Sequence, residues 1–367
     1  MYANDKRIIL TLDAGGTNFV FSAIQGYQEV VEPLTLPAIS DNLDACLDRL
    51  AEGFKKIKAA LPMPPAAISF AFPGPADYQN GIIGDLPNFT AFKGGVALGA
   101  FLENKFSIPV YINNDGSLFA YGEALHGALP LVNKWLKEAG SPKRYENLLG
   151  VTLGTGFGGG VVINQNLLLG DNDCGGYLWC FRNKKYPDLI AEESVSIRAI
   201  KRVYHELSGD EVTDLTPKEI FYIAEGERVG NMKAAIASFE ELGEMAGAIL
   251  ADALTLIDGI LVIGGGLAGA HKYIVPSMIK EMKRDVGMLS GDVFPRFGTD
   301  VYNLMDATDK EAFVRNKTQR VKVPQSDRYV NYEKEKRTAI LVSPIGTNRA
   351  VMYGAYAFAL QQLDKQK

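Results

Sequence analysis

A turn rich in glycine near the N-terminus has the residue types needed to bind phosphate. It lies between two apolar segments and consists of Gly15, Gly16, Thr17 and Asn18. One alanine separates it from Asp13, the last residue of the first segment. Two glycines between two strands form a tight hairpin whose backbone N–H groups can approach a phosphate. Thr17 and Asn18 add side-chain donors, and Asp13 is placed to contact water bound to a metal ion. Because Gly-Gly turns also occur in ordinary hairpins, this turn alone does not decide between the two interpretations.

A second group of polar residues follows a short apolar segment. Ile108-Pro-Val-Tyr-Ile112 is typical of a strand, and Asn113-Asn114-Asp115-Gly116 comes directly after it. Apolar residues then recur at helical spacing from Leu118 to Leu125, so Asp115 is predicted at the junction between a strand end and a helix start. Ligand-binding residues of α/β proteins concentrate at such junctions. Asp115 is therefore a candidate functional residue, the alternative being a carboxylate that only caps its helix.

Two further glycine turns follow predicted strands, at Gly154-Thr155-Gly156 and at Gly264-Gly265-Gly266. Bare backbone at such turns can contact phosphates or lie against a nucleoside. The first turn continues to Gly159 and satisfies G-x-G-x-x-G, a dinucleotide-binding pattern that requires a helix straight after the glycines. The residues from Val161 to Asn166 predict a strand and a turn instead, so a nicotinamide cofactor is disfavoured. A P-loop is excluded because G-x-x-x-x-G-K-[ST] does not occur.

Length and composition are those of an ordinary globular protein. The 367 residues are enough for two domains, and 47% of them are hydrophobic and 22% charged. A net charge of -5 argues against nucleic-acid binding, so a small-molecule ligand is expected. Cys46, Cys174 and Cys180 form no disulfide framework and indicate a reducing compartment. No signal peptide is predicted, and acidic residues and glycines interrupt the apolar stretch from Met245 to Ala270, so we expect no membrane span and a cytoplasmic location.

The elements that must position these turns follow from the spacing of apolar residues. Helices are predicted over 41–60, 128–136, 191–207, 217–224, 229–256 and 349–363. Strands are predicted over 66–72, 108–112, 148–153, 161–163, 167–169, 260–263 and 340–343. The helix over 128–136 is interpreted as a surface insertion, and the charged stretch 300–337 as a solvated excursion. Strands and helices alternate along the chain, so the fold class is α/β.

Six ordered motifs resemble the ROK family of sugar kinases and sugar-responsive repressors, over nearly the whole chain. They are Asp13-Ala-Gly-Gly-Thr17, Phe72-Pro-Gly-Pro75, Leu86-Pro-Asn88, Asn114-Asp115, Leu153-Gly-Thr-Gly-Phe-Gly-Gly-Gly160 and Ile263-Gly-Gly-Gly-Leu267. The resemblance implies the actin-like ATPase fold of the hexokinase type (ribonuclease H-like), with two α/β domains and a cleft between them. We expect a small domain of residues 1–115 plus 348–367 and a large domain of 116–347, with insertions near 128–147 and 300–337.

The same resemblance implies roles for the glycine turns. Residues 13–17 would be the first phosphate loop, 154–156 the second, and 264–266 the adenosine loop of an ATP site. Phosphoryl transfer to a sugar hydroxyl also needs charge neutralisation and a base. We assign the base to Asp115, since a helix N-terminus favours an ionised carboxylate, and expect Asp13 to orient a hydrated Mg²⁺. Asn114 is expected to hold sugar hydroxyls, and Asn88 either does so or only stabilises its turn.

The chain departs from the family in the segment that contacts the sugar. A Gly-Glu-x-Gly-His sequence is usual there, whereas this chain has Gly176-Tyr177-Leu178-Trp179-Cys180. Tyr177 and the residues 171–173 could supply the missing contacts, although a solvated loop explains them as well. Glu192 resembles the next sugar-binding Glu of the family, and Trp179 is expected in the core.

The family's zinc site, a His with three closely spaced cysteines, is expected to be absent. None of His126, His205 and His271 lies near Cys174 or Cys180 in the sequence, and a structural zinc needs about four ligands.

These features predict an ATP-dependent kinase that phosphorylates the 6-hydroxyl of a hexose, with glucose the leading substrate. N-acetylhexosamine, mannose and fructose stay open because the sugar-contacting segment is altered, and a non-catalytic sugar-binding regulator is the alternative of another class. Only twelve residues precede Asp13, so no DNA-binding domain and no nucleic-acid partner are expected. The family resemblance suggests a homodimer.

Overall fold

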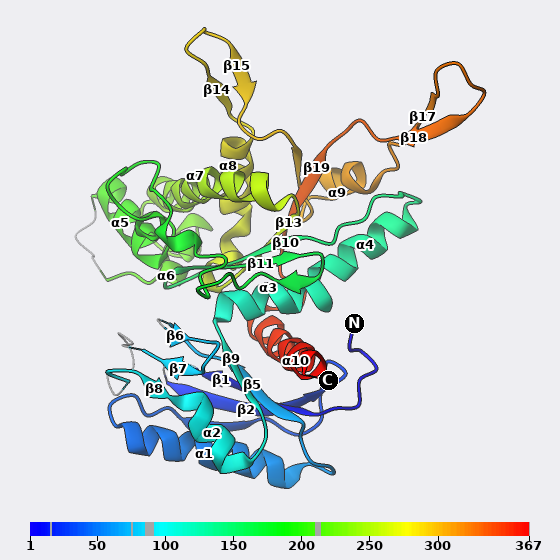
Figure 1. Ribbon diagram of the computed structural model, residues 1–367. Coiled ribbons are helices and arrows are strands. Elements are labelled where there is room, and N and C mark those ends of the chain that lie inside the picture. The colour runs from blue at the N-terminus through cyan, green and yellow to red at the C-terminus, as the bar shows by residue number, and fades with distance from the viewer. Residues whose placement is uncertain (15–16, 75, 85–91, 210–213, 367) are drawn as a thin grey trace. The chain divides into compact units, whose positions relative to one another are not determined.

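The computed structural model describes the chain except for residues 15–16, 75, 85–91, 210–213 and 367. The described part divides into two compact units, each with helices and one main sheet (Figure 1). The first unit comprises Met1–Gly127, Gly160–Gly176 and Ile345–Lys367, and the second comprises Ala128–Gly159 and Tyr177–Pro344. Residues 116–127 and 160–176 thus group with the two terminal segments, whereas the sequence-based boundaries place them in the large domain.

The sheet of the first unit has the order β3-β2-β1-β5-β9, and β4 also pairs with β2. Its strands are β1 (Ile9–Ala14), β2 (Asn18–Gln25), β3 (Gln28–Glu29), β4 (Leu34–Pro37), β5 (Ala67–Ala71) and β9 (Val110–Asn113). β1 and β2 form the predicted antiparallel hairpin, whereas β1, β5 and β9 run parallel. Asp13 pairs with Ala71, and Ala71 pairs with Asn113. The carboxyl ends of these three strands therefore meet at one edge of the sheet.

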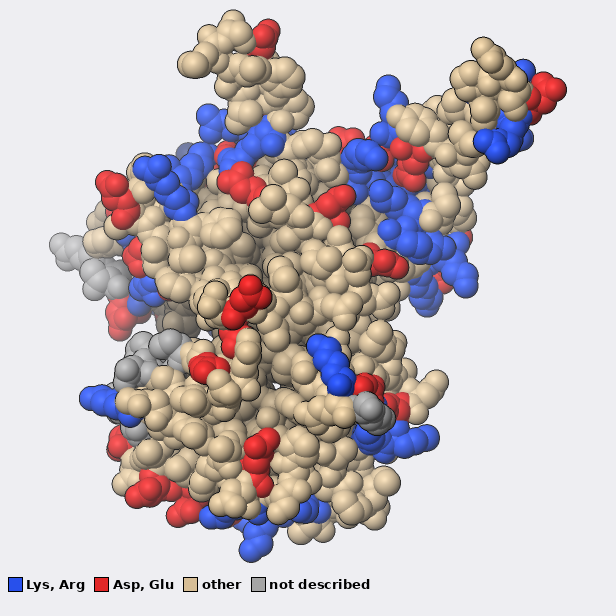
Figure 2. Space-filling model, viewed as in Figure 1, with Lys and Arg blue, Asp and Glu red and all other residues tan. Residues whose placement is uncertain are grey.

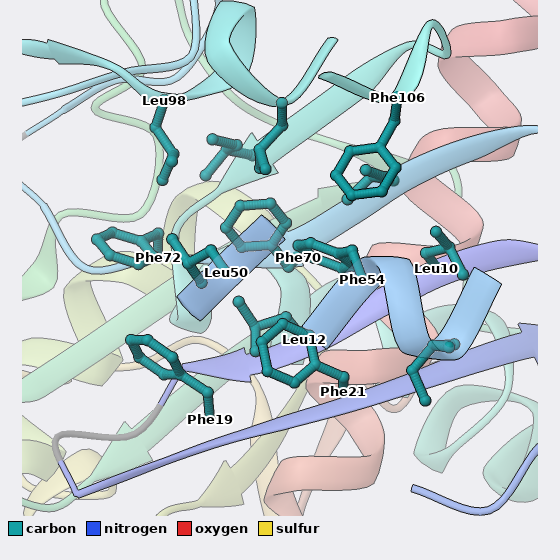
Figure 3. Close-up of a cluster of buried hydrophobic side chains, with 14 of the residues drawn as sticks. Leu10, Leu12, Phe19, Phe21, Leu50, Phe54, Phe70, Phe72, Leu98 and Phe106 are labelled. Atoms are coloured by element: carbon teal, nitrogen blue, oxygen red, sulfur yellow. The ribbon is translucent and has the colours of Figure 1, made fainter. Parts of the chain in front are cut away.

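One face of this sheet carries a hydrophobic core that is rich in phenylalanine (Figure 3). Alternate residues of a strand point to opposite faces, so Leu10 and Leu12 enter this core while Asp13 does not. Helix α1 (Leu43–Ala60) buries Phe54 here, with its ring edge-on to Phe21 at a centroid distance of 5.1 Å. The helix begins at the cap Asn42, whose side chain accepts the N–H of Ala45.

Two helices of the first unit cross at very close range. Helix α3 (Asp115–Leu125) packs against α10 (Thr347–Lys365), which also contacts β1 and β5. A Cβ at Gly122 would overlap with the carbonyl of Ala350, and a Cβ at Gly354 would overlap with the carbonyl of Leu118. Both positions therefore require glycine, because a side chain at either would push the helices apart. This crossing fixes the helix that begins at Asp115.

The remaining elements of the first unit are short. They are β6 (Ala76–Asp77), β7 (Ile82–Ile83) and β8 (Val96–Ala97), which form a small sheet, and helix α2 (Leu98–Phe106).

The second main sheet repeats the order of the first, as β12-β11-β10-β13-β19, and adds β16 beyond β19. Its strands are β10 (Leu148–Leu153), β11 (Phe157–Ile163), β12 (Asn166–Leu167), β13 (Ile260–Gly264), β16 (Asp300–Asn303) and β19 (Arg337–Val342). β10, β13, β19 and β16 are parallel. The division between the units falls inside β11, after Gly159. One arrangement of a hairpin followed by parallel strands thus occurs twice in the chain.

The helices of the second unit confirm most of the predicted segments. They are α4 (Ala128–Glu138), α5 (Ile197–Ser208), α6 (Pro217–Ala224), α7 (Met232–Ile257), α8 (His271–Met282) and α9 (Ala307–Val314), with 3₁₀ turns at Leu178–Cys180, Ala191–Glu193 and Gly266–Ala270. α6 begins with a capping box between Thr216 and Glu219, with Pro217 as its first residue. The predicted helix over 191–207 was wrong at its start, because 191–193 form a separate turn. No helix among the described residues is long and apolar enough to span a membrane.

The prediction of a solvated excursion over 300–337 was wrong in part. β16 lies parallel to β19 in the main sheet, and Val301 and Phe313 are buried. Beyond α9, the chain does leave the body of the unit as a hairpin of β17 (Gln319–Lys322) and β18 (Tyr329–Tyr332). A second hairpin, β14 (Asp285–Gly287) with β15 (Val293–Pro295), was not predicted. Both hairpins project from the second unit (Figure 1).

Candidate functional site

The sheet of the first unit brings Asp13, Asn114 and Asp115 to one edge. Asp13 and Asn113 occupy matching positions on either side of β5, and neighbouring strands are about 4.8 Å apart. The backbone N–H of Phe72 donates to the carbonyl of Asn113 at 3.0 Å, which extends the pairing of β5 with β9 to the last residue of β9. Asn114 and Asp115 follow immediately, where α3 begins. The predicted strand–helix junction is therefore present, with both polar side chains at it.

Asn114, and not Asp115, caps helix α3. The Oδ1 atom of Asn114 accepts the N–H groups of Gly116 at 2.9 Å and Ser117 at 3.4 Å. Asn113 in turn accepts the N–H of Asn114 through its own Oδ1 at 2.8 Å. The interpretation of Asp115 as a simple cap was thus wrong, because its neighbour performs that role. The same geometry restricts Asn114, since only its Nδ2 group remains to donate to a ligand.

Asp115 is the first residue of α3, and its side chain is exposed. Its Oδ1 accepts the N–H of Gly116 at 2.9 Å, a contact that lowers the pKa of the carboxyl. Desolvation by surrounding protein atoms is the larger effect, and the pKa of Asp115 is raised above its ordinary value. The N–H groups at the helix N-terminus thus favour the ionised carboxylate, as predicted, but desolvation outweighs them. A raised pKa makes the carboxylate a stronger base while it stays accessible.

Asp13 lies close enough to Asp115 for the two carboxylates to repel each other. The pKa of Asp13 is raised by desolvation and then by the negative charge of Asp115. Among the described residues, no Lys or Arg forms an ion pair with either group. Two acidic side chains without a cation suit a hydrated Mg²⁺, which keeps several water ligands and binds through few carboxylates. The described residues contain no cluster of three or more His, Cys, Asp or Glu that could hold a metal without such water ligands.

The glycine turn after Asp13, predicted to bind phosphate, is described in part. Gly15 and Gly16 lie outside the described residues, as does Asn88. Thr17 and Asn18 are exposed, and the carbonyl of Thr17 accepts the N–H of Ala38 at 2.9 Å. The backbone after the turn is thus held by β4, while both side chains stay open to a ligand.

The glycine turn at 154–156 joins β10 to β11, so a strand and not a helix follows it. The predicted strand after these glycines is therefore confirmed. The N–H of Gly154 donates to the carbonyl of Gly156 at 3.1 Å, which closes the turn. No protein atom lies within 4 Å of the place where a Cβ of Gly154 would stand. Packing therefore does not require glycine there, whereas close approach of a ligand would.

The third glycine turn contacts the end of β10. Gly265 has a φ of +86°, and a Cβ there would overlap with the backbone of Leu153. Both the left-handed backbone and the close contact require glycine. The next residue, Gly266, has open space where a Cβ would be. This turn thus lies beside the strand end that leads into Gly154, and it leaves bare backbone exposed.

Glu192 lies beside the turn at 154–156. Its Oε2 accepts the N–H of Phe157 at 3.0 Å, and a Cβ at Gly156 would stand 2.5 Å from the same oxygen. The other oxygen, Oε1, pairs with Arg198 at 3.2 Å. Sequence analysis missed Arg198, because a contact over six residues between a 3₁₀ turn and a helix has no recognisable spacing. Glu192 is thus held by two bonds beside the glycine turn at 154–156.

Within the altered segment at 176–180, residues 178–180 form a 3₁₀ turn in which Leu178 is buried and Trp179 and Cys180 are exposed, while Tyr177 before it is half-buried. Trp179 is 39% exposed, so its prediction as a core residue was wrong. The ring of Tyr177 lies against that of Trp179 at a centroid distance of 6.0 Å. Upstream, Asp173 accepts from the backbone and side chain of Gln79 at 3.3 and 3.4 Å, within the first unit. The segment thus presents two aromatic rings where the family usually has Glu and His.

The repeated sheet order, with glycine turns and an aspartate at the strand ends, defines the actin-like ATPase fold. The sequence profile of the ROK family matches residues 9–288, and the chain belongs to this family. Both the resemblance and the fold predicted from the sequence are confirmed.

Individual relatives differ in their names. The crystal structure of a glucokinase from Parabacteroides distasonis is 62% identical, covers 98% of this chain and 99% of its own, and has a TM-score of 0.89. An N-acetyl-D-glucosamine kinase from Vibrio parahaemolyticus is 27% identical over 316 residues, which are 77% of this chain and 97% of the relative. A glucokinase from Thermotoga maritima is 28% identical over 174 residues, 47% of this chain and 50% of the relative.

Proposed function

We propose that the chain is an ATP-dependent sugar kinase that phosphorylates the 6-hydroxyl of a hexose, with glucose the leading substrate. The observation that carries this proposal is the carboxylate of Asp115, which is open to solvent, has a raised pKa and stands beside Asp13 at the strand ends. Support for glucose comes from the relative of 62% identity, which is named a glucokinase.

In the proposed reaction, the sugar O6 attacks the γ-phosphorus of ATP. A bond forms between O6 and the γ-phosphorus, the bond from this phosphorus to the β–γ bridging oxygen breaks, and ADP leaves with that oxygen. Asp115 accepts the hydroxyl proton, and the Nδ2 group of Asn114 donates to a neighbouring sugar hydroxyl. The cap bonds at Gly116 and Ser117 hold Asn114 in one orientation. The crossing of α3 with α10 keeps both residues in position.

The nucleotide is assigned to the glycine turns. We assign phosphates to Thr17, Asn18 and the turn at 154–156, and the adenosine to 264–266, because their backbone is exposed and Gly154 and Gly266 have free space on the Cβ side. Asp13 would hold Mg²⁺ through water. When bound, Mg²⁺ neutralises charge on the phosphates. The assignments of Gly15, Gly16 and Asn88 follow from the sequence alone.

The identity of the sugar rests on Glu192 and the segment around Tyr177. Glu192 is anchored by Phe157 and Arg198 and is proposed to accept from sugar hydroxyls. Tyr177 replaces the acidic residue that is usual in the family. N-acetylglucosamine is the second candidate, because the Vibrio parahaemolyticus relative that spans 77% of this chain is named for that substrate.

A coupled assay of ADP release tests the proposal. Purified protein is mixed with ATP, Mg²⁺ and, in parallel, glucose, N-acetylglucosamine, mannose or fructose, and kcat/KM is measured for each sugar. We expect the highest value for glucose. A sugar that raises the melting temperature of the protein without any release of ADP would identify a sugar-binding regulator and refute the kinase. ADP release with N-acetylglucosamine at a higher kcat/KM would keep the kinase and correct the substrate.

A further inference from the structure

Three charged side chains lie together beside the glycine turn at 154–156. Glu192 and Glu193 are neighbours in the 3₁₀ turn Ala191–Glu193, and Arg198 lies in the first turn of α5. The Nη2 atom of Arg198 donates to Oε1 of Glu192 at 3.2 Å and to Oε1 of Glu193 at 2.9 Å. Ion pairs are common on the surface of the second unit, where acidic and basic side chains lie close together at several places (Figure 2). The pair with Glu192 has a further property, because this carboxylate also bonds to the residue that follows the glycine turn.

The carboxylate of Glu192 is fixed at both of its oxygens. Oε2 accepts the N–H of Phe157 at 3.0 Å, and Oε1 accepts from Arg198. An ionised carboxylate offers about four lone-pair sites, and the described residues fill two of them. The side chain is 23% exposed, so a ligand can reach the lone pairs that stay open. Because the two bonds fix the plane of the carboxylate, they also fix the direction of these open lone pairs.

Backbone bonds hold the surrounding turns without the guanidinium of Arg198. The N–H of Ala191 donates to the carbonyl of Phe181 at 2.7 Å, which fixes the start of the 3₁₀ turn. The N–H of Ile197 donates to the carbonyl of Gly154 at 2.9 Å, which fixes the start of α5 against the glycine turn. Loss of the guanidinium would therefore leave the backbone in place and release only the carboxylate that it contacts.

Without a cation between them, the carboxylates of Glu192 and Glu193 would repel each other. Within the part of the chain that the structure describes, Arg198 is the cation that forms ion pairs with them. Its side chain is 51% exposed, so water screens these pairs and they contribute little to the free energy of unfolding. The free energy that decides between orientations of one partly exposed side chain is equally small. The ion pairs are therefore sufficient to orient Glu192, although they are too weak to hold the fold together.

We propose that Arg198 is a positioning residue for the sugar, which holds the carboxylate of Glu192 so that its open lone pairs accept from sugar hydroxyl groups. This role rests on the proposed function, in which Glu192 contacts the sugar, and it adds a residue that acts only through Glu192. A carboxylate that is already oriented loses less conformational freedom when the sugar binds. The glycine turn keeps its own backbone bond to Ile197, so Arg198 affects the affinity for the sugar and not the affinity for ATP.

Arg198→Met tests this role, because Met keeps an unbranched apolar side chain and removes the charge. In the coupled assay of ADP release, we expect the KM for the preferred sugar to rise about threefold to tenfold and the KM for ATP to change less than about twofold. The dissociation constant of the sugar, measured by titration calorimetry without ATP, should rise by the same factor. Because calorimetry needs no turnover, it decides the role of Arg198 even if a natural chain without ADP release refutes the kinase. An unchanged affinity for the sugar, or an equal increase of both KM values, would overturn the role.

A double-mutant cycle shows whether Arg198 acts through Glu192. Glu192→Gln removes the negative charge that the guanidinium holds, so the two substitutions should not be additive. We expect Arg198→Met to change the dissociation constant of the sugar less than about twofold when Glu192→Gln is already present. The full loss in both backgrounds would show that Arg198 acts independently of Glu192, which contradicts the proposal.

Two further variants separate positioning from a general loss of structure. Arg198→Lys should restore most of the affinity for the sugar, because one nitrogen makes both bonds and the donors of an ammonium group can replace it. Arg202→Met is the matched control, since Arg202 lies one turn further along α5 and pairs with Glu206 and Glu241 instead. It should leave the affinity for the sugar unchanged. Equal losses for Arg202→Met and Arg198→Met, or no recovery with Arg198→Lys, would refute the positioning role.

Discussion

Replacement of Asp115 by Asn removes the proposed base and leaves the local geometry intact. The amide oxygen of Asn can still accept the N–H of Gly116, which now lies 2.9 Å from Oδ1 of Asp115. The cap at Asn114 is unaffected, because its own bonds to Gly116 and Ser117 do not involve the carboxylate. Any change in turnover therefore reports on proton transfer.

A general base contributes about 10²–10⁴-fold to a rate, which corresponds to roughly 3–5 kcal/mol in the activation free energy. We expect kcat of Asp115→Asn to fall by this factor, while KM for the sugar changes less than about threefold because the amide keeps the contacts of the neutral carboxyl. In the natural chain, turnover should fall at acid pH as the carboxyl of Asp115, whose pKa is raised, becomes protonated. This acid limb of the pH profile should be absent in Asp115→Asn.

Stability gives an independent check with a defined sign. The pKa of Asp115 is higher in the folded chain than in the unfolded one, so its stabilising contribution is fully present below the ordinary carboxyl pKa. That contribution is lost as the pH rises through the raised value, so at neutral pH the ionised carboxylate opposes folding. Asp115→Asn should therefore melt at the same temperature as the natural chain or higher.

The assay measures initial rates of ADP release from pH 5 to 9 at saturating ATP. Asp44→Asn is the matched control, since Asp44 is an exposed acid in the first turn of α1, after the cap Asn42. It should keep full turnover. A decrease of less than tenfold for Asp115→Asn, with the control unchanged, would remove Asp115 from the base role.

Two further substitutions test the surroundings of this group. Asp13→Asn removes a negative charge beside Asp115, so the acid limb of the residual activity should shift to lower pH; an unchanged limb would show that the two groups are not coupled. Gly265→Ala should lower the free energy of unfolding by about 2 kcal/mol or more, from its left-handed φ and its contact with Leu153, measured by urea denaturation. Gly266→Ala, with open space around it, is the control and should cost less than about 1 kcal/mol.

The sequence predicted those parts of the fold that are determined by residues adjacent in the chain. The hairpin around Asp13 and the strand–helix junction at Asp115 were found because apolar strands end abruptly in polar or glycine residues. The strand after Gly156 was found because the residues that follow the glycines lack helical spacing. These features depend on residues adjacent in the chain, and backbone geometry fixes their consequences.

Other features depend on contacts between distant residues. Arg198 is recognisable as the partner of Glu192 only once the 3₁₀ turn and α5 are placed. The exposure of Trp179 and the direction of the Asp115 pKa shift reflect the number of protein atoms around each group, which no local pattern contains. The many charged residues over 300–337 predicted a segment exposed to solvent. β16 nevertheless belongs to the main sheet, where its apolar residue Val301 is buried.

The close crossing of α3 with α10 has a consequence for biosynthesis. The two helices are separated by more than two hundred residues, nearly all of which are made before α10 leaves the ribosome. Until then, the nascent chain holds Gly122 without the backbone it must pack against. The first unit, although most of it is translated first, therefore completes its packing only after the last helix is made. A chain truncated before α10 would lack the helix that packs against α3, which begins at Asp115.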